Sequence, residues 1–323
     1  MPPIKIGVGV PRGVGDPAGF GRPEHKLGLR YAQRAEELGF DSVWVPDHYF
    51  FERPPGTLTP YPEAWTLMTA IGATTRRVQI GSMVMAAGFR PPELLAHMAD
   101  AFQDLFDGRL LLGLGAGNQV AEHAAFGIDF ERRVGRFAEY LKILSALMKG
   151  ESISLEGRHY RLRDATLRIQ PRRAPILIAA GGERMLDLAA QYADAWNPAG
   201  GGGEQGFKTR LGQLQAAMRT HGRDPSEMEI TASATVMVAP DAQTADRYVE
   251  KLTTIPPGGT AEQVRAGFAV GTPDQVAATL RQRLDWGASH LIVAIGAQPF
   301  SLWSDEMLEL FAREVLPKLR GGR

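Results

Sequence analysis

An aspartate and a histidine that could transfer protons stand side by side near the N-terminus. Asp47 and His48 follow the apolar run "DSVWV" at 41–45, which predicts a buried β-strand. Neighbouring residues of an extended chain point to opposite sides, so the imidazole can face a reactant while the carboxylate braces the loop. A histidine suits proton transfer near pH 7. The spacing alone leaves two interpretations, an acid/base pair or an aspartate that anchors the loop beside a partly exposed histidine.

The stretch "DGRLLLGLGAGN" at 107–118 is similar to the start of a dinucleotide-binding fold. That fingerprint requires glycines in the pattern G-x-G-x-x-G and a helix that begins inside it. Here Asn118 stands where the third glycine belongs, and the charged segment "ERRVGR" precedes the next helical pattern. We therefore interpret the stretch as the exit of a strand, where glycines let the backbone approach a ligand.

A second group of glycines follows another apolar run. Gly181 and Gly182 lead directly into a helical pattern that begins with Glu183 and Arg184. The free N–H groups at the start of a helix, together with the helix dipole, can bind a phosphate. An ordinary glycine-rich turn between a strand and a helix is the alternative interpretation.

An apolar surface is expected at a third exit, in the segment "GSMVMAAGFRPP". Met83, Val84 and Met85 would ordinarily belong to the core of the protein. They become candidates for a ligand site only if a flat molecule lies on them.

Strand-length apolar runs alternate with amphipathic segments of helical length along the whole chain. Most runs are continuously apolar, as in parallel strands that are buried on both faces. This alternation predicts an α/β fold, a (β/α)8 TIM barrel that spans 1–323 as one domain, with its chemistry at the carboxyl ends of the strands. The predicted strands are 4–10, 41–45, 78–86, 109–115, 175–180, 194–198, 229–238 and 290–296.

The length beyond a minimal barrel is expected in inserted segments. The alternating pattern around Glu156 and Gly157 predicts a β-hairpin in the segment 151–170. Stretches rich in glycine and proline predict mobile loops within 199–225 and 240–272.

The composition points to a protein that acts on small molecules. The 36 basic and 36 acidic residues balance, which gives no overall field for nucleic acid or an anionic membrane. Cysteine is absent, which excludes disulfides and thiolate chemistry, and the seven histidines lack the spacing of a zinc site. We find neither a signal peptide nor an apolar run of about 18 residues. The expectation is a cytoplasmic protein without a metal, nucleic acid or membrane partner.

Several segments together resemble the bacterial luciferase-like superfamily of flavin- and deazaflavin-dependent oxidoreductases. They are "AEELGFDSVWVPDH", "FRPPELLAHMADAFQDLFDGRLLLGLGAGN", "EHAAFG", "PILIAAGGERMLDLAAQYADAW", "VGTPDQVAATL" and "LELFAREVLPKL", which extend over nearly the whole chain. The resemblance implies a (β/α)8 barrel, a flavin-type cofactor and a homodimer.

The resemblance also assigns roles to residues at the strand exits. It implies a non-prolyl cis peptide between Met83 and Val84, behind the cofactor ring. Asp47 and His48 match a pair that some deazaflavin-dependent members use, with His48 as the acid/base. The residues implied for the cofactor's ribityl chain and phosphate are Ala116, Gly117, Asn118, Gly181, Gly182, Glu183 and Arg184.

These features predict an oxidoreductase that uses coenzyme F420 and passes a hydride between the deazaflavin C5 and an organic, apolar substrate. Phe50, Phe51, Phe89 and Trp196 are expected at an apolar barrel mouth. The first alternative is a monooxygenase that uses reduced FMN and dioxygen, and the second is a flavin-binding protein without turnover. Asn118 stands where sugar-phosphate dehydrogenases of this superfamily carry a catalytic glutamate, so glucose 6-phosphate is not an expected substrate.

Overall fold

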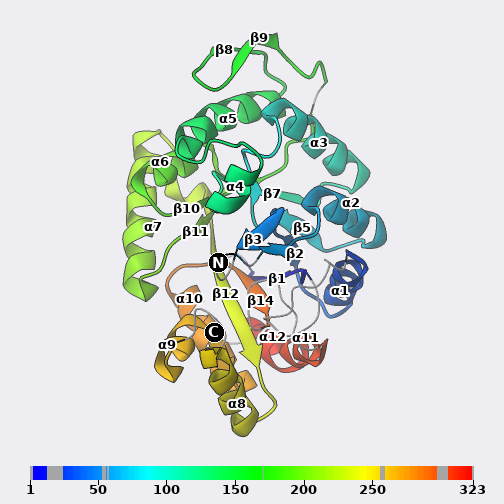
Figure 1. The fold of residues 1–323 in the computed structure, drawn as a ribbon, viewed down its shortest axis with the longest axis vertical. Helices are drawn as coiled ribbons and strands as arrows, with labels where there is room; N and C mark the ends of the chain where they lie inside the picture. Colours follow the sequence, from blue (N-terminus) through cyan, green and yellow to red (C-terminus); the bar gives the residue numbers. More distant parts are fainter. Residues whose placement is uncertain are drawn as a thin grey trace. The chain divides into compact units, whose positions relative to one another are not determined.

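The computed structural model describes residues 3–12, 25–52, 56, 58–169, 171–254, 259–296 and 305–321, and Figure 1 shows their fold. The chain forms two compact units. The first contains Met1–Val78 and Ile230–Arg323, and the second contains Gln79–Glu229. Each unit is built from parallel strands linked by helices, which is the alternation that the sequence predicts.

The first unit has a parallel sheet in which β1 (Lys5–Gly9) lies between β2 (Ser42–Val45) and β14 (His290–Ile295). β14 pairs in turn with β12 (Glu229–Val238), and the short β13 (Ala269–Gly271) pairs with the end of β12. Every residue of β2 is buried, as are nearly all residues of β1 and β14. This burial explains why their sequences are almost continuously apolar.

A polar cluster fills part of the core near the amino ends of β2 and β14. The Ser42 hydroxyl lies 2.8 Å from Nε2 of His290 and accepts the indole N–H of Trp44 at 2.8 Å. These three side chains are almost completely buried. A Cβ at Gly7 would collide with Ser42 Oγ and would lie 2.5 Å from Trp44 Nε1, so only glycine fits at this position.

Among the helices of the first unit, α10 has a well-defined start, because Thr272 and Gln275 exchange hydrogen bonds in a capping box. The same helix ends before Gly287, whose φ is +116°. The helices are α1 (His25–Glu37), α2 (Ala64–Thr74), α8 (Ala242–Thr254), α9 (Ala261–Gly267), α10 (Pro273–Asp285), α11 (Asp305–Leu310) and α12 (Leu316–Arg320), with a π-helical turn at Phe311–Val315.

The prediction of mobile loops within 240–272 is wrong for most of that segment, because α8 and α9 occupy it. α8 buries Ala245, Val249 and Leu252 on one face. Their spacing is helical, but the neighbouring glycines and prolines led us to predict loops. Residues 255–258 of the predicted loop lie outside the described residues.

The second unit has a parallel sheet in the order β5 (Gln79–Ser82), β7 (Leu110–Gly115), β10 (Ile176–Ala180) and β11 (Ala195–Pro198). The two-residue strand β6 (Met85–Ala86) continues the course of β5 along β7. With these strands, all eight predicted runs are confirmed as strands. The helices are α3 (Pro92–Leu105), α4 (Val120–Ala125), α5 (Arg133–Met148), α6 (Glu183–Tyr192) and α7 (Gly203–Thr220).

The long helix α7 corrects a second loop prediction. It fills most of the segment 199–225, where a run of glycines predicts a mobile loop. α7 begins directly after Gly202, whose φ is +102°. The glycines therefore shape the start of the helix, and the helix itself is fixed by burial of Phe207, Leu214 and Met218.

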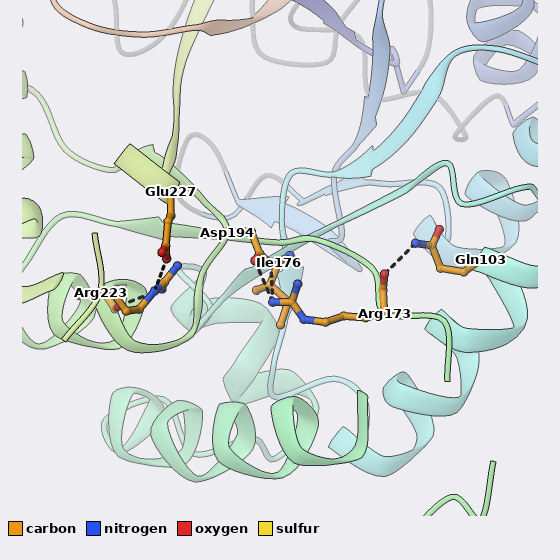
Figure 2. A network of polar contacts seen from close by, with 7 residues as sticks. Gln103, Arg173, Ile176, Asp194, Arg223 and Glu227 are labelled. Atoms are coloured by element: carbon orange, nitrogen blue, oxygen red, sulfur yellow. Dashed lines mark hydrogen bonds and ion pairs between the residues drawn. The ribbon is translucent and has the colours of Figure 1, made fainter. Parts of the chain in front are cut away.

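A network of polar contacts fixes the amino ends of β10 and β11 (Figure 2). The carboxylate of Asp194 accepts the guanidinium of Arg173 and the backbone N–H of Ile176, each at 2.8 Å. The side-chain amide of Gln103 on α3 donates to the Arg173 carbonyl at 3.3 Å. These contacts lie at the opposite ends of the strands from the glycines Gly181 and Gly182, so we assign them to stability.

An antiparallel hairpin is added to the second unit, as predicted for the segment 151–170. Its strands are β8 (Ile153–Glu156) and β9 (Arg161–Ala165). The carboxylate of Glu139 on α5 holds the turn by accepting the backbone N–H groups of 158–160. Burial alone would raise the pKa of Glu139, but these three donors lower it below its ordinary value.

Candidate active site

The exit of β2 carries the predicted acid/base pair. Asp47 and His48 follow the last residue of β2 closely. Asp47 is buried with 5% of its surface exposed, whereas His48 is partly exposed. The unequal burial agrees with the predicted division, in which the carboxylate braces the loop and the imidazole is accessible to a reactant.

A hairpin that the sequence pattern did not predict forms a wall around His48. Its strands, β3 (Phe50–Glu52) and β4 (Leu58–Pro60), pair directly after the exit of β2. The His48 ring meets the rings of Phe51 and Tyr61 edge to face, at centroid distances of 5.0 and 5.4 Å. Three-residue strands are too short for an alternating pattern to stand out, so no sequence signal marked this hairpin.

The peptide bond between Met83 and Val84 is cis, as the resemblance implies. It lies in a bulge between β5 and β6, which both pair with β7. Three residues separate Gly81 from Met85, whereas two separate their partners on β7. Met83 and Val84 are partly exposed in this bulge.

Two glycines of β7 make room for the bulge. The Ser82 hydroxyl donates to the Gly113 carbonyl at 2.8 Å and accepts the Gly113 N–H at 3.0 Å. A Cβ at Gly113 would collide with the Ser82 carbonyl oxygen, and a Cβ at Gly115 would lie 2.7 Å from Val84 Cγ2. The interpretation that these glycines let a ligand approach is therefore wrong for Gly113 and Gly115, which admit the neighbouring strand instead.

Position 117, the last glycine of this stretch, requires glycine for two reasons. One is its backbone conformation, and the other is a buried histidine that we did not predict. Its φ is +95°, and a Cβ would lie 2.5 Å from Nε2 of His123 on α4. The His123 ring is completely buried, with Nδ1 2.7 Å from the Gln119 carbonyl. Nε2 has no hydrogen-bond partner among the described residues. His123 thus supports the segment in which Ala116 is buried and Asn118 is exposed.

The exit of β10 has the open helix start that a phosphate site requires. Gly182 is the N-cap of α6, no side chain caps this helix, and a Cβ at Gly182 would meet nothing within 4 Å. The first N–H groups of α6 therefore have no side-chain cap, and the space beside Gly182 is open. Gly181 is a glycine for a different reason, because a Cβ there would collide with the carbonyl oxygen of Ala199, which follows β11.

The side chains of Glu183 and Arg184 are exposed on the first turn of α6. They line a hollow of about 760 Å³ together with Asp187 on the same helix and with Gln213 and Thr220 on α7. Because Glu183 and Arg184 line this hollow, their side chains lie along the surface of α6. The backbone N–H groups at this exit are therefore better placed as phosphate donors than the Arg184 side chain.

The second unit brings its candidate segments to one edge of its sheet. Met85, which follows Val84, pairs with Leu114 of β7, and Leu114 pairs with Ile178 near the end of β10. The bulge, the segment 116–118 and the glycines after β10 therefore follow one another across adjacent parallel strands. Together they provide an apolar surface next to free backbone donors.

Trp196 does not line an apolar mouth, which corrects one prediction. It is completely buried, its indole N–H donates to the Ala180 carbonyl at 3.0 Å, and its ring lies 5.6 Å from that of Phe207 on α7. The side chain thus faces the helix layer. Phe51 and Phe89, by contrast, are partly exposed, as an exit residue should be.

Metal ligands do not gather anywhere in the described ranges, where no three His, Asp or Glu side chains come together. Among the described helices, none is long and apolar enough to cross a bilayer. The candidate chemistry is therefore built from one histidine, apolar surfaces and backbone donors.

Comparisons with known proteins agree with this arrangement. The luciferase-like monooxygenase family matches residues 16–290. An F420-dependent glucose-6-phosphate dehydrogenase of Amycolatopsis mediterranei is 29% identical over 318 residues, covering 90% of this chain and 94% of the relative. The enzyme of the same name from Kineococcus radiotolerans is 30% identical over 316 residues, with coverages of 90% and 92%.

Two solved structures have the same fold. An F420-dependent secondary alcohol dehydrogenase, in complex with an F420-acetone adduct, matches with a TM-score of 0.81 at 19% identity, covering 98% of this chain and 99% of that one. A monooxygenase from Streptomyces bottropensis matches with a TM-score of 0.78 at 26% identity, covering 97% and 99%.

The fold is therefore the predicted α/β class, a (β/α)8 barrel of the luciferase-like type. The chain belongs to the luciferase-like monooxygenase family and is an oxidoreductase. That residues 1–323 form a single domain stays a prediction.

The packing of Gly117 against His123 can be tested by a double-mutant cycle. Gly117→Ala should destabilise the protein, by about 1–2 kcal/mol for the positive φ and by about 1–3 kcal/mol for overpacking. His123→Ala should also destabilise it, because it removes a buried ring. The double variant should lose less than the sum of the two, since the collision disappears while the cost of φ stays. Urea unfolding of the four proteins measures this coupling, and strictly additive losses would contradict the contact.

Proposed function

We propose that this protein is an F420-dependent oxidoreductase that transfers a hydride between C5 of the deazaflavin and an organic substrate. The observation that carries the proposal is the partly exposed His48, fixed between two aromatic rings beside the buried Asp47. Such a histidine can exchange a proton with a substrate oxygen near neutral pH. The relatives named above as F420-dependent enzymes support the choice of cofactor.

The second unit fits a flavin-type cofactor. The open N–H groups after Gly182 suit its phosphate, and the partly exposed Met83 and Val84 suit one face of its ring. Ala116, Gly117 and Asn118 would border the ribityl chain. A bound deazaflavin would supply the carbon centre that accepts or donates a hydride.

The protein's own contribution is to move one proton. When an alcohol is oxidised, the hydrogen on its carbon leaves with the electron pair as a hydride, and the hydroxyl proton passes to His48. When a carbonyl compound is reduced, the protonated His48 returns that proton to the oxygen as the carbon gains the hydride. Asp47, which is buried next to His48, would hold the loop in place during both the oxidation and the reduction.

A reduced-FMN monooxygenase is the second candidate, because the Streptomyces bottropensis monooxygenase shares the fold at 26% identity. A flavin-binding protein without turnover is a third candidate, and a catalytic role for His48 would favour either enzyme over it.

We do not propose glucose 6-phosphate as substrate, although the curated relatives carry that name. Asn118 stands where the resemblance places a catalytic glutamate, and an amide cannot take over the proton transfer of a carboxylate. The homodimer implied by the resemblance stays a prediction.

The proton-transfer role predicts that His48→Ala lowers kcat by about 10²–10⁴-fold. Affinity for F420 should change little, because the residues proposed for the phosphate and ring lie in the second unit. Asp47→Asn should have a smaller effect, since the amide can still brace the loop. Anaerobic single-turnover mixing with a panel of alcohols and ketones measures the rate, and fluorescence titration measures affinity. A His48→Ala variant as fast as the parent enzyme would assign the pair to structure.

The proposed phosphate site predicts that substitutions at two adjacent glycines affect different quantities, cofactor affinity at Gly182 and stability at Gly181. Gly182→Val should weaken F420 binding about tenfold or more, because the branched side chain would occupy the space in front of the α6 N–H groups. It should leave the fold intact, since φ of −87° and ψ of 157° suit a β-branched residue. Gly181→Val should instead lower the unfolding temperature.

A deazaflavin that lacks the phosphate is the matched control ligand for the Gly182 variant. Its affinity should be the same for Gly182→Val and the parent protein if the turn contacts the phosphate. An equal loss of affinity for both ligands would place the phosphate elsewhere.

A further inference from the structure

Arg12 presents a cation for which the described residues supply no carboxylate partner. It follows β1 by three residues and is partly exposed. Its guanidinium carbon lies 5.7 Å from the centroid of the Tyr61 ring. No described Asp or Glu forms an ion pair with it.

Tyr61 places this cation close to the proton-transfer histidine. The Tyr61 ring contacts His48 at a centroid distance of 5.4 Å and Phe51 at 6.2 Å. β1 and β2 are paired parallel neighbours, so the residues after them emerge at the same edge of the sheet. Arg12 and His48 therefore both contact the same aromatic ring.

The contact with Tyr61 positions the guanidinium without neutralising it. A cation above an aromatic ring is worth about 0.5–1 kcal/mol at an exposed site, which is enough to favour one side-chain position. No described carboxylate neutralises the charge, and the planar set of N–H donors matches a carboxylate or a phosphate by paired hydrogen bonds. An arginine at a strand exit that has no carboxylate partner among the described residues, beside a proposed acid/base, is thus suited to an anion.

We propose that Arg12 binds the anionic group of the substrate, while Phe51 and Tyr61 pack against its carbon skeleton. The substrate is then a small organic anion, a carboxylate or a phosphate ester with an apolar body, rather than the neutral apolar compound that the sequence predicts. The inference rests on the proposed function in one respect, because it takes His48 as the group that meets the reacting oxygen.

Binding to the purified protein tests the proposal without any turnover. The probes are benzoate, phenyl phosphate and the neutral benzyl alcohol, each measured by calorimetric titration and by ligand-observed NMR. Arg12→Gln should weaken the binding of benzoate or phenyl phosphate about tenfold or more, because hydrogen bonds to a charged group are lost. Binding of benzyl alcohol should not change. The anion that binds the parent protein more tightly identifies the group as a carboxylate or a phosphate.

Two further variants make the result specific. Arg12→Lys should retain part of the anion affinity, because it keeps the charge but loses the planar donors. Arg30→Gln, on the exposed side of α1, is the matched control and should bind all three probes as the parent does. Thermal unfolding checks that each variant is folded. The proposal is overturned if neither anion binds the parent protein, or if Arg12→Gln binds both anions as the parent does.

This outcome is separate from that of the proposed function. Anion binding that depends on Arg12, in a protein that never exchanges a hydride with F420, would contradict the function and support the inference. Hydride transfer that depends on His48, with anion binding independent of Arg12, would contradict the inference alone.

Discussion

The close packing of the bulge at Ser82–Val84 against β7 is the constraint on which the proposed cofactor surface depends. In place of the regular backbone hydrogen bonds between the two strands, the Ser82 hydroxyl donates to the Gly113 carbonyl and accepts the Gly113 N–H. A side chain at Gly113 or Gly115 would push the bulge away from its neighbour. β7 is therefore glycine-rich because a second backbone must approach it, and that approach brings Met83 and Val84 to the edge shared with the α6 helix start. Gly117 is constrained in the same way, because the buried imidazole of His123 supports the backbone there and leaves no room for a side chain.

The first unit holds one polar ring, the imidazole of His48, at the apolar exit of β2. The rings of Phe51, in the β3–β4 hairpin, and of Tyr61, which directly follows it, meet His48 edge to face. Such edge-to-face contacts between rings favour one orientation of the imidazole. The same Tyr61 ring also positions Arg12. The hairpin thus connects the proposed acid/base to the proposed anion site, whereas the polar cluster of Ser42, Trp44 and His290 serves the core.

The sequence predicts the strands well because eight buried parallel strands leave long apolar runs between turn residues. It predicts the hairpin at 151–170 for the same kind of reason, an alternating pattern around a glycine. It fails where the pattern is short or the reason for a residue lies far away in the chain. The three-residue strands β3 and β4 carry too few positions, and the glycines of β7 are explained only by Ser82 and Val84, about 30 residues earlier. Trp196 shows that an aromatic residue after a strand start can face the helix layer as readily as a mouth.

The choice between a deazaflavin and a flavin is the central claim, and one titration tests it most directly. Purified protein is titrated anaerobically with F420 and with FMN, each in its oxidised and reduced state, and the complexes are then mixed with candidate substrates with and without dioxygen. The account predicts tighter binding of F420 than of FMN, and hydride transfer that needs no dioxygen. Tight binding of reduced FMN, product formation only with dioxygen and no response to F420 would contradict it and identify a monooxygenase.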